Sequence, residues 1–290
     1  MATLLLLAGV HAVTFEEISS GYHTLQSQRI QSTLKFLASK HFNGRATGTP
    51  EAALTTAYIA SVFQRQGLKA PAGSGDSYVQ GFEVVQAVPR GESQASIEIE
   101  EGANLTLKMG EDFLPAPWGP DAEEVRGRMV FAGYGITAPE LKYDDFARLD
   151  AKGKIAVVLS KFPGGNKQTT WDFYSQKDYD EPLEKALNAQ RAGAAGIIVI
   201  LPSNESIPAL SSLNFKTAKT SLASEVEALR IPAVFVSFPT GEKLIRRSRS
   251  REQTLQALQE KIDTGLKPAS LPLERSASLQ TRYERKKIQA

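Results

Sequence analysis

The chain has 290 residues, of which 41% are hydrophobic and 23% are charged, and its 34 basic and 32 acidic residues give a formal net charge of +2. These values are typical of a globular protein of one or two domains, and the near balance of charge argues against nucleic acid as a partner. The chain has no cysteine, which excludes disulfides, a thiol nucleophile and thiolate metal ligands.

The first residues raise the question of a leader. Residues 1–12 contain an apolar stretch, Leu4 to Val10, and Val10-His11-Ala12 resembles a signal-peptide cleavage site. The stretch is short and has no basic start, so we expect either a signal peptide clipped by a misassigned start codon or a buried N-terminal strand or helix. A signal peptide would place the protein outside the bacterial cytoplasm, secreted or periplasmic, and the lack of cysteine fits that location. No apolar run reaches about 18 residues, so we predict no membrane span.

Two helices are predicted near the N-terminus. The first covers Tyr22 to Ser39, and its apolar face is formed by Ile30, Leu34 and Leu37. The second begins at Pro50 after the N-cap residue Thr49, and it ends at Gln66 before Gly67. Ile59, Val62 and Phe63 supply its apolar surface.

Extended structure is predicted next. Residues 77–88 read as one extended segment. Alternating apolar residues at 93–100 and 105–107, separated by Gly102, predict a β-hairpin. Residues 113–120 are rich in proline and glycine and are predicted to form a loop.

The segment from Met129 to Leu159 is the most informative part of the sequence. A short apolar strand, 129–132, is broken by Gly133, Tyr134 and Gly135, where glycine permits a turn or a close approach. A polar loop follows, and the unbroken apolar run 155–159 predicts a strand buried on both faces. The loop holds Pro139, Tyr143, Asp144, Asp145, Asp150, Gly153 and Lys154.

The remainder alternates between helix and strand. We predict a loop over 163–180, a helix over 182–191 that Gly193 ends, and apolar strands over 196–201 and 231–236. A predominantly helical segment, 240–263, and a proline-broken extended segment with a basic tail, 265–290, complete the chain.

The glycines and aspartates of the central segment form an ordered set of motifs. These are Gly133 to Ile136, Pro139, Tyr143 to Asp145 and Asp150 to Ile155. In this order they resemble the protease-associated (PA) domain that is inserted in secreted zinc aminopeptidases of the M28 family. The helix and strand around Gly193 and Gly196 resemble the same domain. Gly44-Arg45, Gly48-Thr49, Tyr58-Ile59-Ala60 and Gly67-Leu68 resemble the peptidase segment that precedes the insertion.

The resemblance implies an α/β (α+β) fold. Its PA-type domain would have a central β-sheet or open barrel with flanking helices, beside an N-terminal helical segment of an incomplete peptidase domain. The expected divisions are a leader at 1–12, a peptidase segment at 13–88, the PA domain at 89–265 and a return to the peptidase domain at 266–290.

Catalytic chemistry is hard to find in the sequence. Family members hold two zinc ions, and their first ligands form a His-x-Asp motif. The three histidines, His11, His23 and His41, do not begin such a motif. We therefore predict no catalytic residue, metal ligand or cofactor in this chain, and two zinc ions only in a full-length family member.

The sequence gives weaker support for three other kinds of site: a catalytic triad, a calcium site and a basic surface patch. A Ser-His-Asp triad would need His23 or His41, and calcium binding at Asp144, Asp145 and Asp150 lacks the EF-hand spacing. Turn and capping roles suit these aspartates better. The basic run at residues 246–251 has no interleaved aromatic residue, so a solvated helix face is favoured over an anionic-surface patch.

Two functional hypotheses follow. In the first, the chain is the N-terminal portion of a zinc aminopeptidase, and the full-length enzyme acts on a peptide or protein substrate. In the second, it is a stand-alone, non-catalytic PA module that binds proteins or peptides. The sequence does not determine the substrate or the oligomeric state.

Overall fold

The computed structural model describes residues 25–71, 74–100, 103–164, 179–205, 207, 228–245 and 254–289. The described residues form two compact units, the first ending at Gly81 and the second spanning Phe82–Gln289. Each unit is described by itself. The predicted leader, His11, His23 and the basic run at 246–251 lie outside the described residues.

The first unit is helical, as predicted. It contains α2 (Ser27–Leu37), the short 3-10 helix η1 (Lys40–Phe42) and α3 (Pro50–Arg65). The hydroxyl of Thr49 accepts a hydrogen bond from the amide of Ala52 at 3.3 Å, which caps α3. Gly67 follows the helix with φ of 68°, a conformation that favours glycine.

The apolar faces of these two helices are largely exposed. Neither α2 nor α3 contains a buried residue, and Ile30 and Leu34 are 57% and 64% exposed. Packing in this unit centres on an aromatic group, because the ring of Phe36 lies 5.1 Å from that of Phe42 and 5.3 Å from that of Tyr58. The described part of this unit therefore has little core of its own.

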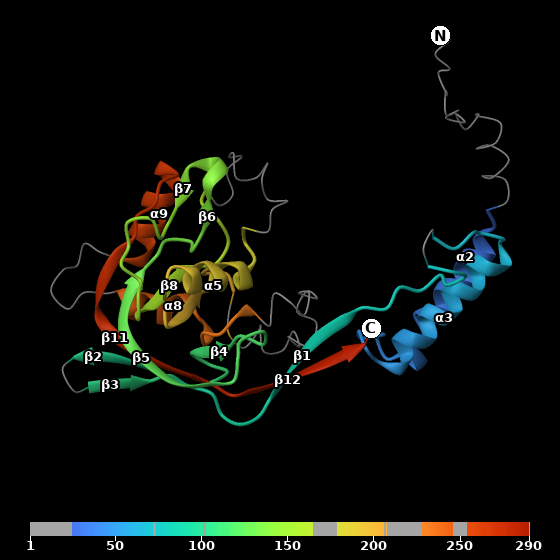
Figure 1. Ribbon diagram of the computed structural model, residues 1–290, viewed down its shortest axis with the longest axis horizontal. Coiled ribbons are helices and arrows are strands. Elements are labelled where there is room, and N and C mark those ends of the chain that lie inside the picture. The colour runs from blue at the N-terminus through green and yellow to red at the C-terminus, as the bar shows by residue number, and fades with distance from the viewer. Residues whose placement is uncertain are drawn as a thin grey trace, which may run out of the picture. The chain divides into compact units, whose positions relative to one another are not determined.

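The second unit is built on an eight-stranded sheet, whose strand order is β3-β2-β11-β5-β8-β9-β10-β4. The strands β5, β8, β9 and β10 run parallel, and the other neighbours pair antiparallel. The sheet is strongly curled, and β5 and β11 follow its curve (Figure 1). Its strands are β2 (Gln94–Glu100), β3 (Ala103–Thr106), β4 (Phe113–Pro115), β5 (Ala122–Phe131), β8 (Ile155–Leu159), β9 (Gly196–Ile200), β10 (Ala233–Val236) and β11 (Leu271–Thr281).

Two small sheets complete the β-structure. β1 (Glu83–Pro89) pairs antiparallel with β12 (Tyr283–Gln289), and β6 (Thr137–Ala138) pairs antiparallel with β7 (Tyr143–Asp144). A 3-10 helix, η2 (Pro139–Leu141), joins β6 to β7.

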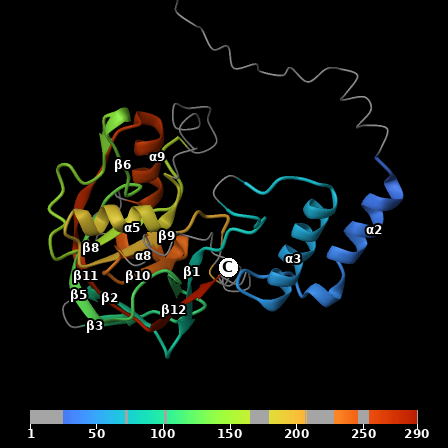
Figure 2. The ribbon, with the colours of Figure 1, turned by 45° about the vertical axis from the view of Figure 1, so that its right-hand side comes forward.

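Both faces of the parallel strands are buried. On one face, alternate residues pack against α8 (Phe238–Ile245) and α9 (Leu255–Gly265), and on the other they pack against α5 (Pro182–Arg191). Figure 2 shows α5 lying over β8 and β9. All five residues of β8 are buried, which explains its unbroken apolar sequence.

The predicted α/β fold with a central sheet and flanking helices is confirmed, and the hairpin of β2 and β3 is also as predicted. One local prediction was wrong. The predicted loop at 113–120 begins with the edge strand β4, where Pro115 is tolerated at the border of the sheet. The segment 240–263, predicted to be mainly helical, is helical in its described part. It contains α8 and α9, and α9 has its own N-cap, Thr254, whose hydroxyl accepts from the amide of Ala257 at 3.1 Å.

The strand β11 lies inside the sheet. It pairs with β2 on one side and β5 on the other, although more than 130 residues separate β5 from it. Its pairing with β5 shifts register between Pro272 and Ser276, because proline interrupts the ladder. The predicted domain boundaries at residues 88 and 265 stay a prediction. β11 begins at Leu271, after the second predicted boundary, and pairs within the sheet of the second unit.

The exposed faces of α2 and α3 lead to a test by hydrogen exchange. Fully burying an aliphatic side chain stabilises a fold by roughly 1.5–3 kcal/mol, so the exposed side chains leave this unit with little stability. We expect the amides of α2 and α3 to exchange at least about a hundredfold faster than those of β8 in the intact chain. Equal protection of the three elements would contradict this account of the first unit.

Candidate ligand-binding site

A tight turn follows β5 and forms the centre of the site. Gly133 and Gly135 have φ of 50° and 68°, and the amide of Gly135 donates to the carbonyl of Ala132 at 2.7 Å. A Cβ atom on Gly133 would lie 2.3 Å from Oδ1 of Asp145, and one on Gly135 would lie 2.9 Å from Cγ1 of Val158. Both backbone conformation and space therefore require glycine at these positions.

Asp145 holds the amide side of this turn. Its Oδ2 accepts from the amides of Tyr134 at 3.0 Å and Ile136 at 3.1 Å, and its Oδ1 accepts from the hydroxyl of Tyr143 at 2.9 Å. The carboxylate is buried. Burial raises the pKa of Asp145 to about 7, although its hydrogen-bond donors and the charge of Lys185 act in the opposite direction. Burial, followed by the charge of Asp145, raises the pKa of Tyr143.

Lys185, on α5, holds the carbonyl side. Its side chain is 1% exposed, and Nζ donates to the carbonyls of Tyr134 and Lys161, each at 2.6 Å. Nζ also lies 5.7 Å from the centre of the Tyr134 ring, and Asn188 Nδ2 donates to the carbonyl of Gly135 at 3.2 Å. Burial lowers the pKa of Lys185 to about 7, against the attraction of Asp145 and Asp180.

The side chain of Tyr134 connects the turn to α9. Its hydroxyl donates to Oδ1 of Asp263 at 2.7 Å, and the amide of Gly164 donates to the same oxygen at 3.1 Å. Burial, followed by the hydrogen bond to Asp263, raises the pKa of Tyr134, so the phenol stays protonated. The turn, α5 and α9 are therefore joined through one residue.

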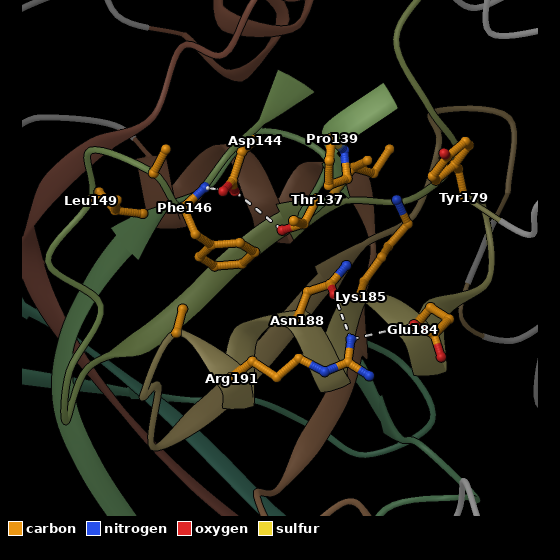
Figure 3. A pocket seen from close by; sticks show the side chains of 13 residues that line it. Thr137, Pro139, Asp144, Phe146, Leu149, Tyr179, Glu184, Lys185, Asn188 and Arg191 are labelled. Atoms are coloured by element: carbon orange, nitrogen blue, oxygen red, sulfur yellow. Dashed lines mark hydrogen bonds and ion pairs between the residues drawn. The ribbon is translucent and has the colours of Figure 1, made fainter. Parts of the chain in front are cut away.

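A cavity of about 620 Å³ opens between this loop region and α5 (Figure 3). Asp144 borders it, and its Oδ1 accepts from the hydroxyl of Thr137 at 3.1 Å and from the amide of Phe146 at 2.9 Å. On the α5 side, Arg191 Nη1 lies 3.6 Å from Oε2 of Glu184. The complete lining consists of Ile136, Thr137, Pro139, Asp144, Phe146, Ala147, Leu149, Tyr179, Glu184, Lys185, Asn188, Arg191 and Ala192.

A second cavity, of about 500 Å³, lies at the carboxyl ends of β8 and β9. Tyr134 and Lys161 line it, and Lys161 is paired with Glu205 at 3.4 Å. Lys185 lines the first cavity and binds the carbonyls of two residues that line the second. Carboxyl ends of parallel strands are common ligand positions in α/β sheets.

The other residues that the sequence analysis identified have structural roles: they stabilise loops or allow close packing between strands. Lys154 Nζ lies 2.8 Å from Oδ2 of Asp150, and the amide of Gly153 donates to the carbonyl of Gly193 at 2.9 Å. Gly196, in β9, lies against Leu279 of β11. Gly44 and Arg45 both have positive φ in the first unit, where the Arg45 side chain donates to the carbonyl of Leu37.

Three residues of the site were missed by sequence reasoning: Lys185, Asn188 and Asp263. Lys185 carried a usable signal, because it lies among the buried residues of α5, between Leu183 and Ala186. A lysine on the apolar face of a helix requires polar partners, and only the structure shows which ones.

The described residues contain no group of three or more His, Cys, Asp or Glu side chains arranged to hold a metal ion, and His41 lies exposed in η1. None of the helices that the structure describes has the length and apolar character to cross a membrane.

Comparison with known proteins assigns the central segment. Residues 122–244 match the family model described as PA domain, and this span contains the Gly133–Gly135 turn, Asp145 and α5. The predicted PA domain is thereby confirmed. No match is found among curated proteins.

Solved structures similar to this chain include two bacterial aminopeptidases. An aminopeptidase from Aneurinibacillus sp. strain AM-1 is 19% identical, with 91% of this chain and 46% of that chain covered and a TM-score of 0.47. BSAP, a zinc aminopeptidase from Bacillus subtilis, is 18% identical, with 89% and 44% covered and a TM-score of 0.32. The chain thus spans less than half the length of these two structures.

The glycine turn can be tested with a matched pair of substitutions. Gly133→Ala places a methyl group against the Asp145 carboxylate, whereas Gly153→Ala, at φ of 68°, meets nothing within 4 Å. We expect Gly153→Ala to lower the free energy of unfolding by about 1–2 kcal/mol through backbone conformation alone. Gly133→Ala should cost about 3 kcal/mol or more, because it also displaces a buried hydrogen-bond acceptor. Urea denaturation measures both, and equal losses would contradict the proposed close approach.

The buried lysine gives a pH-dependent prediction. Its pKa is lowered from 10.5 to about 7, so within that window the folded state binds fewer protons and stability rises with pH. The raised pKa of Asp145 has the opposite effect below about 7. Between about pH 7.5 and 9.5 we expect the free energy of unfolding to rise by up to about 1.4 kcal/mol per pH unit from Lys185. Lys185→Met should remove this rise. Urea denaturation of the unmodified chain and of the variant at several pH values measures it, and the same dependence of the free energy of unfolding on pH in both proteins would contradict the attribution to Lys185.

Proposed function

We propose that this chain is the PA-domain-bearing N-terminal portion of a secreted or periplasmic M28-like zinc aminopeptidase. The full-length protein would remove N-terminal residues from a peptide or protein substrate. Support comes from the PA domain at residues 122–244 and from the ordered motifs around it, including Gly44-Arg45 upstream.

The pairing of β1 with β12 is the observation that carries this proposal. These strands form an antiparallel ladder of seven residue pairs, from Glu83 with Gln289 to Pro89 with Tyr283. The chain therefore enters and leaves the second unit at adjacent positions, which is the geometry that an inserted domain requires. Tyr283 fixes β12 to the sheet, since its hydroxyl donates to the carbonyl of Pro115 at 3.0 Å.

In the proposed enzyme, the catalytic residues would lie in the part of the full-length protein that this chain does not include. The described residues do not fit a zinc site, because they contain no cluster of three ligands, and no catalytic step is derived from them. We assign residues 13–88 to the peptidase domain. The return to that domain, predicted from residue 266, would begin at β12, because β11 pairs within the sheet of the second unit.

A second function is favoured by the cavity of about 620 Å³. It lies within the size range of small-molecule and peptide-fragment sites and combines apolar walls with charged groups. A stand-alone, non-catalytic PA module that binds proteins or peptides would use such a cavity directly.

Expression of the natural gene product distinguishes the two functions. We expect protein made from the genomic locus to hydrolyse an aminoacyl-anilide, to lose activity with a chelator and to regain it with zinc. The 290-residue chain is the matched control and should show neither turnover nor stoichiometric zinc. A natural product that is inactive would favour the binding module, and zinc-dependent turnover by the 290-residue chain would contradict both proposals.

A further inference from the structure

The second cavity, of about 500 Å³, has largely apolar walls. Leu159 and Ile200, at the ends of β8 and β9, line it and are buried. Phe162 and Phe238 line it as well, and both are partly buried against the core. Cavities of this size and character hold small ligands or single side chains of larger ones. An apolar group that leaves water for these walls gains binding free energy in proportion to the area that it buries.

The bend that follows β8 fixes one wall of this cavity. Lys161 has φ of 67°, a left-handed conformation that is uncommon outside glycine. Its carbonyl accepts from the buried Nζ of Lys185 at 2.6 Å, and the amide of Ser160 donates to the carbonyl of Ile200 at 2.9 Å. Residues that their surroundings hold in sparsely populated conformations cluster at ligand sites. The protein therefore maintains this wall before any ligand binds.

Two polar side chains of the lining have unused hydrogen-bonding capacity. Nζ of Lys161 lies 3.4 Å from Oε1 of Glu205, another lining residue, and this ammonium has no other partner among the described residues. An ammonium carries three N–H donors, so two remain available. Gln259, on α9, donates through Nε2 to the hydroxyl of Tyr134 at 3.4 Å, and its Oε1 has no partner within the described part of the chain. The cavity thus offers an open donor and an open acceptor.

The charges at this cavity favour a neutral ligand. Lys161 and Glu205 are the only charged residues among the described residues that line it, and they form a pair. A ligand carboxylate placed at Lys161 would meet the charge of Glu205, and a ligand ammonium placed at Glu205 would meet the charge of Lys161. A peptide group carries no charge and has one acceptor and one donor, which match Lys161 and Gln259.

We infer that the second cavity binds an internal segment of a peptide chain through one apolar side chain. This side chain would lie against Phe162 and Phe238. A peptide carbonyl would accept from Lys161, and a peptide N–H would donate to Oε1 of Gln259. A free chain end would instead bring a charge beside the pair of Lys161 and Glu205. The inference deepens the binding function proposed above, on which its biological meaning rests, and it adds a site formed by other residues.

The test measures binding to the intact 290-residue chain by isothermal titration calorimetry. N-acetyl-L-phenylalaninamide is the probe, because both of its ends are blocked as in an internal residue. N-acetylglycinamide keeps the peptide groups without the side chain, and L-phenylalanine keeps the side chain with two terminal charges. We expect the probe to saturate the chain below about 10 mM and the other two compounds to bind at least about tenfold more weakly. Absence of saturation at about 10 mM probe, or equal binding of the three compounds, would overturn the inference.

Two variants locate the site. Lys161→Met removes the ammonium and Gln259→Leu removes the amide, and each should weaken binding of the probe at least about threefold through the loss of one hydrogen bond. Lys142→Met is the matched control, because Lys142 also has positive φ, of 53°, and does not line the cavity. It should bind the probe like the unmodified chain.

Unchanged binding by both cavity variants, or an equal loss in Lys142→Met, would show that the probe binds elsewhere and would overturn the assignment. Urea denaturation of each variant, with the midpoint of the unmodified chain expected, separates loss of the site from loss of the fold. Because neither hydrolysis nor zinc is measured, failure of this inference is distinguishable from failure of the proposed peptidase function.

Discussion

The buried turn at Gly133–Gly135 is the constraint on which the second unit depends. Its amides and carbonyls are removed from water, so each needs a partner inside the protein. Asp145 supplies acceptors on one side, and Lys185 and Asn188 supply donors on the other. The two opposite charges are thus held by the backbone dipoles of one short loop. This arrangement fixes the loop against α5 and shapes the cavity beside it.

The parallel strands explain why these groups meet. Because β5, β8 and β9 run in the same direction, the loops that follow them lie at one edge of the sheet. Lys185 reaches the loops after both β5 and β8 from α5, which is the connection between β8 and β9. The Lys185 side chain therefore links α5 to the loops that follow β5 and β8. A substitution at this position is expected to affect both loops as well as α5.

The sequence was most informative where residue type and backbone conformation are strictly coupled. Gly133, Gly135 and the five-residue apolar strand β8 could be predicted because few other arrangements satisfy those patterns. The edge strand β4 was missed because prolines and glycines hid a pairing that depends on distant β10. Lys185 and Asp263 were missed for a similar reason, since their partners lie about 51 and 129 residues away from them and local spacing carries no such information.

The place of β11 in the sheet has a consequence for biosynthesis. The hairpin of β2 and β3 contacts the parallel strands in the sheet order only through β11, which leaves the ribosome after every other strand of that sheet. Until then, β2 and β5 each present an open edge, and open edges are templates for pairing between nascent chains. Arg126 and Arg128 on β5, and Glu98 on β2, place charge along these edges. Such charges act as gatekeepers against aggregation during the interval before β11 is added.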